Sequence, residues 1–227
     1  PAEENGLVQV LARADWLADA DFAIVLEPTD LELQLGCMGG INATVSFLGT
    51  PAHSARPWLG ENAITKAGEW LAQLHLRPPD PVVVGGLEFR EVYSVTKAMA
   101  GVANNIIPGR FDLNLNYRFA PDKQALEAER ALRLMTAAAD EVRIEDLSNS
   151  APVPSGHPML EALMEISGAV VAPKQAWTDV ARLAEIGVAA VNYGPGETAQ
   201  AHQVGESVAI ENLNVAMANL VTLLTRE

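Results

Sequence analysis

The sequence has 227 residues, of which 49% are hydrophobic and 19% are charged. This composition excludes a disordered tail, a coiled coil and a collagen-like repeat, and the length suits one large domain or two modest ones. The 29 acidic side chains outnumber the 15 basic ones, which gives a formal net charge of −14. Because such a surface repels a phosphate backbone, we expect no nucleic-acid partner.

The single cysteine, Cys37, excludes an internal disulfide framework and is typical of a protein in a reducing compartment. The longest uninterrupted apolar run is far shorter than the ~20 residues that a membrane span needs. No charged and then apolar signal segment opens the chain. These features predict a cytoplasmic protein without a membrane partner.

The first forty residues have the pattern of an α/β domain. Apolar side chains recur at helical spacing over residues 7–14. The continuous apolar run at 22–26 is typical of a strand buried on both faces of a parallel sheet. Glu27 follows this strand directly, and open α/β sheets bind their ligands at the carboxyl ends of such strands.

From residue 41 the pattern changes to half-buried strands and amphipathic helices. Residues 41–47 and 111–119 alternate between apolar and polar side chains, which predicts strands with one face in a core. Asn62 is expected to cap a helix. The expected order is a strand at 41–47, a helix at 64–74, strands at 82–84, near 93–99 and at 111–119, a helix from 121 to about 139, and a strand at 142–147. This order resembles the split βαβ pattern of a ferredoxin-like domain.

The segment 150–156 is predicted to be a linker, after which the α/β pattern returns. The elements expected there are a helix that begins with Pro158, a short helix after Asp179, a buried strand at 188–193 and a terminal helix over 213–224. We therefore predict an α/β domain built from residues 1–40 and 151–227, into which an α+β domain at 41–150 is inserted.

Two of the four histidines are candidates for chemistry. His53 lies in a loop between a predicted strand and a predicted helix, and His202 follows the strand at 188–193 and a Gly-Pro-Gly turn. Imidazole is a common zinc ligand, but loop histidines are often only solvated. Spacing alone leaves both interpretations open.

Four ordered stretches resemble the co-catalytic dizinc aminoacylase and carboxypeptidase family. The most specific is 49–64, which is similar to the signature of that family's dimerisation domain. The other stretches are 26–29, then 104–109 with 116–119, and finally 177–179 followed by 192–195 and His202. Together they cover most of the chain. The resemblance implies a partial zinc-peptidase-like catalytic α/β domain with an inserted α+β ferredoxin-like lid that forms a homodimer.

The resemblance also implies hydrolysis of an N-acyl amide, with a small-molecule N-acyl amino acid as substrate. Two zinc ions per active site would be expected, with cobalt as a possible substitute. Glu27 and His202 would be metal ligands, and His53 would be a catalytic residue donated by the partner subunit. The residues implied in substrate binding are Asn104, Asn105, Arg118, Thr178 and Asp179.

The sequence Trp-Thr-Asp-Val-Ala-Arg at 177–182 resembles most the family members that remove succinate from N-succinyl-LL-2,6-diaminopimelate in lysine and diaminopimelate biosynthesis. Acetylornithine deacetylase, other N-acyl or N-carbamoyl amidohydrolases, and a non-catalytic dimerisation module remain alternatives. The family's general base and three further metal ligands are expected upstream of Pro1. We therefore expect a C-terminal fragment that is inactive by itself and that binds no metal if the remaining ligands are missing.

Overall fold

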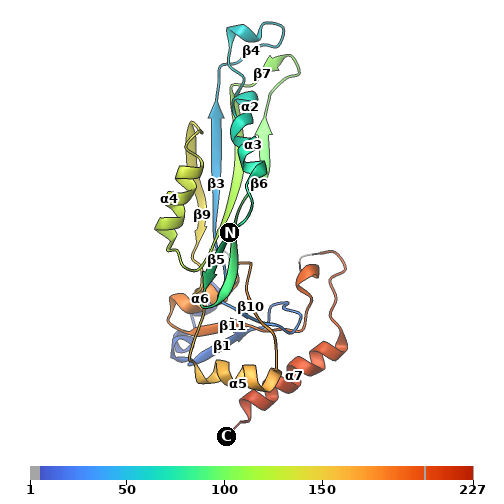
Figure 1. The fold of residues 1–227 in the computed structure, drawn as a ribbon. Coiled ribbons are helices and arrows are strands. Elements are labelled where there is room, and N and C mark those ends of the chain that lie inside the picture. Colours follow the sequence, from blue (N-terminus) through green and yellow to red (C-terminus); the bar gives the residue numbers. More distant parts are fainter. Residues whose placement is uncertain (1–5, 202, 227) are drawn as a thin grey trace.

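A computed structural model describes residues 6–201 and 203–226. The molecule is elongated: a narrow upper part is built on one long sheet, and a broader lower part holds a shorter sheet with helices beneath it (Figure 1). We call the upper part the lid and the lower part the base. In the described residues, no helix is long and apolar enough to cross a membrane.

The lid is a five-stranded antiparallel sheet in the order β5-β6-β8-β3-β9. Its strands are β3 (Gly39–Leu48), β5 (Asp80–Val84), β6 (Leu87–Ala100), β8 (Arg110–Phe119) and β9 (Glu141–Ser148). Four of these strands, β9, β3, β8 and β6, stand in the order of a ferredoxin-like sheet, and β5 adds an edge strand through a tight hairpin. Gly85 and Gly86 adopt φ of 58° and 81° in that hairpin, a backbone conformation that glycine enters without strain.

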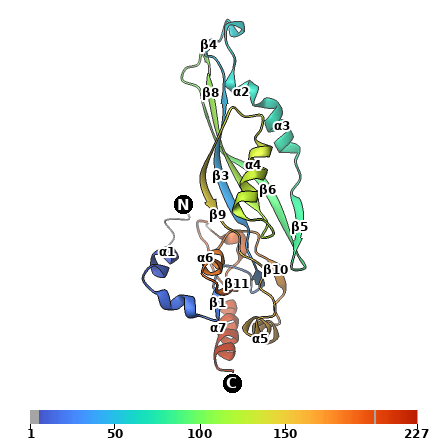
Figure 2. The same ribbon diagram turned by 90° about the vertical axis from the view of Figure 1, so that its left-hand side faces the viewer.

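Helices cover one face of the lid sheet (Figure 2). They are α2 (Ala63–Lys66), α3 (Gly68–Leu76) and α4 (Ala125–Met135). As predicted, Asn62 caps α2, and its side chain accepts a hydrogen bond from the backbone N–H of Ile64 at 3.0 Å. The helix expected from residue 121 begins later, because the Glu127 carboxylate accepts from the N–H of Gln124 and fixes the first turn there.

The lid core lies between this sheet face and the helices. The predicted alternation is confirmed along β8, where Phe111, Leu113, Leu115, Tyr117 and Phe119 are buried. Trp70 of α3 and Leu132 of α4 are buried in the same core. The polar residues that alternate with the buried ones therefore lie on the opposite, open face of the sheet.

The base contains a four-stranded mixed sheet in the order β1-β11-β2-β10. Its strands are β1 (Phe22–Val25), β2 (Leu33–Leu35), β10 (Val171–Pro173) and β11 (Ala189–Asn192). Strands β1 and β11 are parallel, as the sequence predicted. β1 was predicted to be buried on both faces, but all four of its residues are only half-buried. The reason is its position at the end of the described sheet, where β11 is its single partner.

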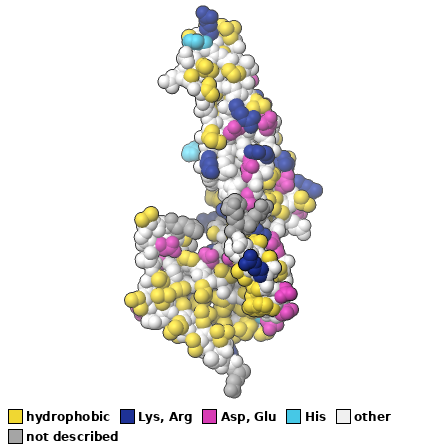
Figure 3. Space-filling view, turned by 180° about the vertical axis from the view of Figure 1, so that it is seen from behind, with side chains coloured by type: hydrophobic (Ala, Val, Ile, Leu, Met, Phe, Trp, Pro, Cys, Tyr) yellow, Lys and Arg dark blue, Asp and Glu magenta, His cyan; other side chains and the backbone are white. Residues whose placement is uncertain are grey.

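Helices complete the base: α1 (Gly6–Leu11), α5 (Pro158–Ser167), α6 (Val180–Glu185) and α7 (Ile210–Leu224). α1 ends at Leu11, three residues before the predicted end at 14, and the 3-10 helix η2 (Asp15–Asp19) follows it. α5 packs against α7, and Leu163 and Leu223 contribute to a buried cluster there. The space-filling view shows hydrophobic side chains gathered over this part of the molecule (Figure 3).

Two chain segments connect lid and base. β3 starts shortly after β2, and the return segment passes through Ala151, which is buried and forms an isolated antiparallel bridge with Cys37. The segment 150–156, predicted to be a linker, is thus held against the base at its start. β3 begins at Gly39 and β9 ends at Ser148, so the lid sheet starts two residues before the division proposed at 41–150, which stays a proposal.

Candidate functional site

Glu27 lies just beyond the carboxyl end of β1, in a loop that is hydrogen-bonded to the turn after β11. The N–H of Gly194 donates to Oγ1 of Thr29 at 3.0 Å, and the N–H of Leu31 donates to the carbonyl of Gly194 at 3.0 Å. A Cβ on Gly194 would lie 2.2 Å from the carbonyl oxygen of Glu27. Only glycine allows this approach, so the sequence brings the Glu27 loop and the turn at 194–196 together.

Lys174 follows β10 and reaches the same loop from the other side of the sheet. Its side chain is buried, and Nζ donates to the carbonyl of Pro28 at 3.4 Å. Burial lowers the pKa of Lys174, while the charge of Glu27 acts in the opposite direction. The sequence analysis missed this residue, because an isolated lysine after a short strand belongs to no recognisable pattern.

Thr178 is buried next to Cys37, and its carbonyl oxygen lies 3.9 Å from Sγ of that cysteine. Burial raises the pKa of the Cys37 thiol, which is typical of an unreactive buried thiol. Among the described residues, the buried oxygens Oγ1 of Thr178 and Oδ1 of Asn192 have no hydrogen-bond partner. Asp179 precedes α6, and its carbonyl accepts from the N–H of Leu183.

Arg118 lies near the base end of β8, on the open face of the lid sheet. It is half-buried, and Nε donates to Oδ1 of Asn116 at 3.1 Å. Directly across the sheet stands Gly40, where a Cβ would lie only 2.7 Å from Nη1 of Arg118. The guanidinium therefore lies over the Cα of Gly40, and within the described chain it forms no ion pair with a carboxylate.

His53 lies at the far tip of the lid, in the short strand β4 (Ala52–His53), which pairs with β7 (Ile106–Ile107). The 3-10 helix η3 (Pro57–Leu59) follows it. His53 is exposed, and its Nδ1 accepts from the N–H of Ala55 at 3.1 Å. The carbonyl of Asn105 accepts from the N–H of Ser54. The structure thus brings His53, Asn104 and Asn105 together at the tip.

The predicted site residues at the lid tip, His53, Asn104 and Asn105, are well separated from those near the base. Eight residue steps along β8 lead from Arg118 to Arg110 at the tip end of the strand, which is about 26 Å at ~3.3 Å per residue. Glu27 follows β1, and Thr178 and Asp179 directly precede α6; both elements lie in the base (Figure 1). Within one chain, His53 therefore does not reach these residues.

The predicted metal ligands are only partly covered by the structure. His202 lies outside the described residues, although the 3-10 helix η4 (Thr198–Gln200) shortly before it is described. The described part of the chain contains no group of three or more His, Cys, Asp or Glu that could hold a metal ion. A catalytic zinc site needs three protein ligands, so these residues alone do not form a complete one.

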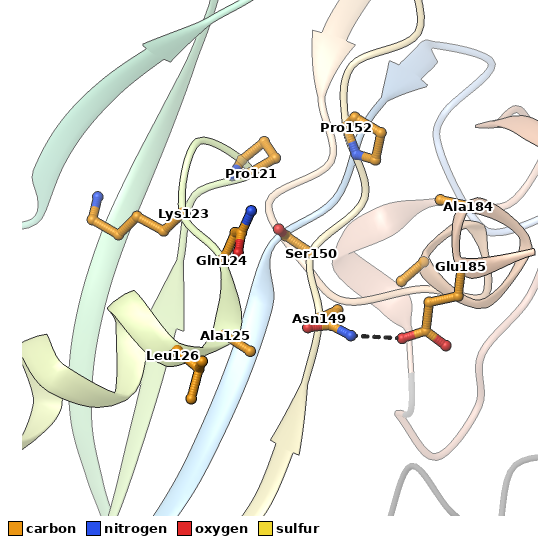
Figure 4. Close-up of a pocket in the computed structure, with 11 residues that line it drawn as sticks. Pro121, Lys123, Gln124, Ala125, Leu126, Asn149, Ser150, Pro152, Ala184 and Glu185 are labelled. Atoms are coloured by element: carbon orange, nitrogen blue, oxygen red, sulfur yellow. Dashed lines mark hydrogen bonds between the residues drawn. The ribbon is translucent and has the colours of Figure 1, made fainter. Parts of the chain in front are cut away.

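A cavity of about 530 Å³ lies between the lid and the base, beside α4 and α6 (Figure 4). In it, Nδ2 of Asn149 donates to Oε1 of Glu185 at 2.9 Å. None of the predicted site residues lines this cavity. The residues predicted for the site therefore lie outside this cavity, and their grouping into one site stays a prediction.

Comparison with known proteins adds independent findings. Residues 35–142 match a family model described as a peptidase dimerisation domain. The chain is 40% identical over 216 residues to a Mycobacterium tuberculosis protein provisionally named succinyl-diaminopimelate desuccinylase DapE, with 94% of this chain and 60% of that protein covered. It is 34% identical over 227 residues to succinyl-diaminopimelate desuccinylase of Corynebacterium glutamicum, with 97% and 61% covered. The chain thus spans about three fifths of the length of these relatives.

Solved structures share the fold. Aminopeptidase PepT from Bacillus cereus matches with a TM-score of 0.75 at 18% identity, over 97% of this chain and 61% of that one. An M20 family metallo-carboxypeptidase from Sulfolobus solfataricus matches with a TM-score of 0.70 at 15% identity, over 96% and 66%. The mixed α/β fold with an inserted lid, which the sequence predicts, is therefore shared with these two solved structures.

Proposed function

Because residues 35–142 belong to the peptidase dimerisation domain family, we propose that this chain is part of a metal-dependent amidohydrolase that removes succinate from N-succinyl-LL-2,6-diaminopimelate. The observation that carries this proposal is the similarity along nearly the whole chain to two proteins named for that activity. The geometry of Arg118 supports it. A half-buried guanidinium without an acidic partner among the described residues is suited to bind a carboxylate through two parallel hydrogen bonds.

In the proposed reaction, water adds to the acyl carbonyl, and the C–N bond of the tetrahedral intermediate then breaks to release succinate and the amine. Arg118 holds a carboxylate of the substrate. Thr178 and Asp179 line the proposed substrate site, which is distinct from the cavity in Figure 4. Asn104 or Asn105 contacts the substrate from the lid tip. His53 of a second subunit donates a hydrogen bond to the oxyanion that forms on the carbonyl oxygen.

Glu27 and His202 are proposed as two of the ligands of a zinc pair, for which cobalt could substitute. Carboxylate and imidazole are suitable zinc donors. The proposed homodimer forms through the lid.

The proposal is tested by ligand binding to the purified chain. We expect N-succinyl-diaminopimelate to bind more tightly than N-acetylornithine in isothermal titration calorimetry. We expect Arg118→Met to weaken that binding at least about tenfold, or ~1.4 kcal/mol, because the substrate carboxylate loses its two hydrogen bonds to a charged guanidinium.

The matched control is Arg130→Met, which removes the same charge from an exposed position on α4 and leaves the affinity unchanged. Equal binding of the two ligands, or an Arg118→Met variant that binds like the wild type, contradicts the proposal. The expectation that this chain alone releases no succinate stays a prediction, and an enzymatic succinate assay with added zinc checks it.

A further inference from the structure

The open face of the lid sheet carries a row of polar side chains that leads along β8 to Arg118. Asn114, Asn116 and Arg118 lie on this face, while Leu115 and Tyr117 between them are buried in the lid core. The row is therefore attached to a rigid central strand with hydrogen-bonded neighbours on both sides.

Hydrogen bonds fix the orientation of the Asn116 amide. Asn116 stands opposite Asn42 of β3, and its Nδ2 donates to Oδ1 of Asn42 at 3.0 Å. An amide group has donors on its nitrogen and acceptors on its oxygen. Because the nitrogen is directed to Asn42, the oxygen is left to accept from Nε of Arg118 at 3.1 Å.

The row continues beyond Asn116 and holds Asn42 in turn. Oδ1 of Asn42 also accepts from Nδ2 of Asn114 at 3.3 Å, and the same Nδ2 donates to Oγ1 of Thr96 on β6 at 2.6 Å. Oδ1 of Asn42 is therefore an acceptor for two amides, which favours the orientation that points the Asn116 carbonyl at Arg118.

Gly40 leaves room for the guanidinium. A side chain there would collide with Nη1, since even a Cβ would lie 2.7 Å away. One bond to Nε, together with the space over Gly40, thus restricts a long and flexible side chain. Within residues 6–201 and 203–226, the hydrogen bond that Arg118 forms through its side chain uses Nε, so its two terminal nitrogens can donate to a ligand.

We propose that Asn116 is a positioning residue that holds Arg118, through a carbonyl oriented by Asn42, in the geometry that binds the substrate carboxylate. This inference rests on the proposed function of Arg118. It extends that function by assigning the orientation of the Arg118 guanidinium to the hydrogen-bonded amides of Asn116 and Asn42.

The test measures succinate binding to the full chain by NMR, together with solvent exchange of the Arg118 Nε–H. We expect Asn116→Leu to weaken succinate binding about fivefold and to speed up exchange of that N–H. Asn114→Leu is the matched control. It makes the same change two residues further along β8, on the same face of the sheet, at a side chain that is not hydrogen-bonded to Arg118 among the described residues. It should stay within about twofold of the wild type, since the 3.0 Å bond from Asn116 to Asn42 remains.

Two substitutions at Asn42 keep the inference testable if Asn116→Leu fails to fold. Asn42→Asp preserves an acceptor for Asn116 and should retain affinity, whereas Asn42→Leu should weaken it like Asn116→Leu. If Arg118→Met loses succinate but Asn116→Leu binds it normally, the positioning role is overturned and the proposed function stands. If the wild type does not bind succinate, or if Arg118→Met binds it normally, the proposed function of Arg118 fails as well.

Discussion

At the residue scale, one glycine determines how the base site is assembled. Gly194 lies against the backbone of the Glu27 loop, and both its N–H and its carbonyl are hydrogen-bonded to that loop. A side chain there meets backbone atoms, which cannot rotate away as a flexible side chain would. The position of Glu27 is therefore coupled to residue 194.

We predict that Gly194→Ala lowers the free energy of unfolding by about 1–3 kcal/mol, the usual range for overpacking a well-packed region. Urea denaturation measures this change. Gly68→Ala is the matched control, because Gly68 begins α3 and a Cβ there meets nothing within 4 Å. The control should be neutral or slightly stabilising, and a Gly194→Ala variant as stable as the control would contradict the prediction.

The sequence indicated candidate ligand-binding residues such as Arg118. It did not indicate the neighbouring residues, such as Asn116, that fix their orientation by hydrogen bonds. The family resemblance pointed to Arg118, and the sequence supports that choice because the arginine lies on the polar face of an alternating strand. The role of Asn116 depends on which residue of β3 stands opposite it, and register is a tertiary property. His157 shows the same limit: it caps α5 and stacks on Phe22 with ring centroids 4.8 Å apart.

At the element scale, long alternating strands could be predicted and short ones could not. β3 and β8 have ten residues each and a clear period of two. β2 and β10 have three residues each, which is too short for a periodic signal. The ferredoxin-like order of the lid therefore followed from the sequence, whereas the mixed pairing in the base did not.

Asp140 ties three elements of the lid together. It precedes β9, and its carboxylate accepts from the N–H of Leu48 on β3 at 2.6 Å and from Nζ of Lys66 on α2 at 3.0 Å. The bond from Leu48 and then the bond from Lys66 lower the pKa of Asp140 below its ordinary value of 3.8. The folded state therefore binds this proton less readily than the unfolded state does.

We predict that this contribution to stability is present above pH 3.8 and is lost as the pH falls from 3.8 through the lowered pKa. Asp140→Asn keeps an acceptor for Leu48 but carries no charge, so its unfolding midpoint should fall less steeply as the pH is lowered from about 5 to about 2. Thermal unfolding followed by circular dichroism measures this. Asp19→Asn removes the same charge from an exposed position in η2 and should follow the wild type. If the unfolding midpoint of Asp140→Asn falls with pH as steeply as that of the wild type, Asp140 does not make this contribution to stability.

At the scale of the whole molecule, the proposed site is divided between the two ends of the lid. His53 is at the tip, whereas Arg118 lies about 26 Å from Arg110 at the tip end of β8. This span is too long for one small substrate to contact both His53 and Arg118 in one chain. If both act on the same substrate, they come from different chains. Given the roles that the family resemblance implies for His53 and Arg118, this separation is a physical reason for a second copy.

We therefore predict that the chain sediments as a dimer at micromolar concentration, through α2, α3 and the neighbouring strand. Ile64 on α2 is 42% exposed and Leu126 on α4 is 67% exposed. A charge on the contacting helix places a desolvated carboxylate in a self-complementary interface, so Ile64→Glu should shift the protein toward monomer. Leu126→Glu adds the same charge to the other helical surface and should leave the dimer intact. A monomeric wild type would contradict the prediction, whereas dissociation by Leu126→Glu alone would place the interface on α4 and leave His53 without its proposed role.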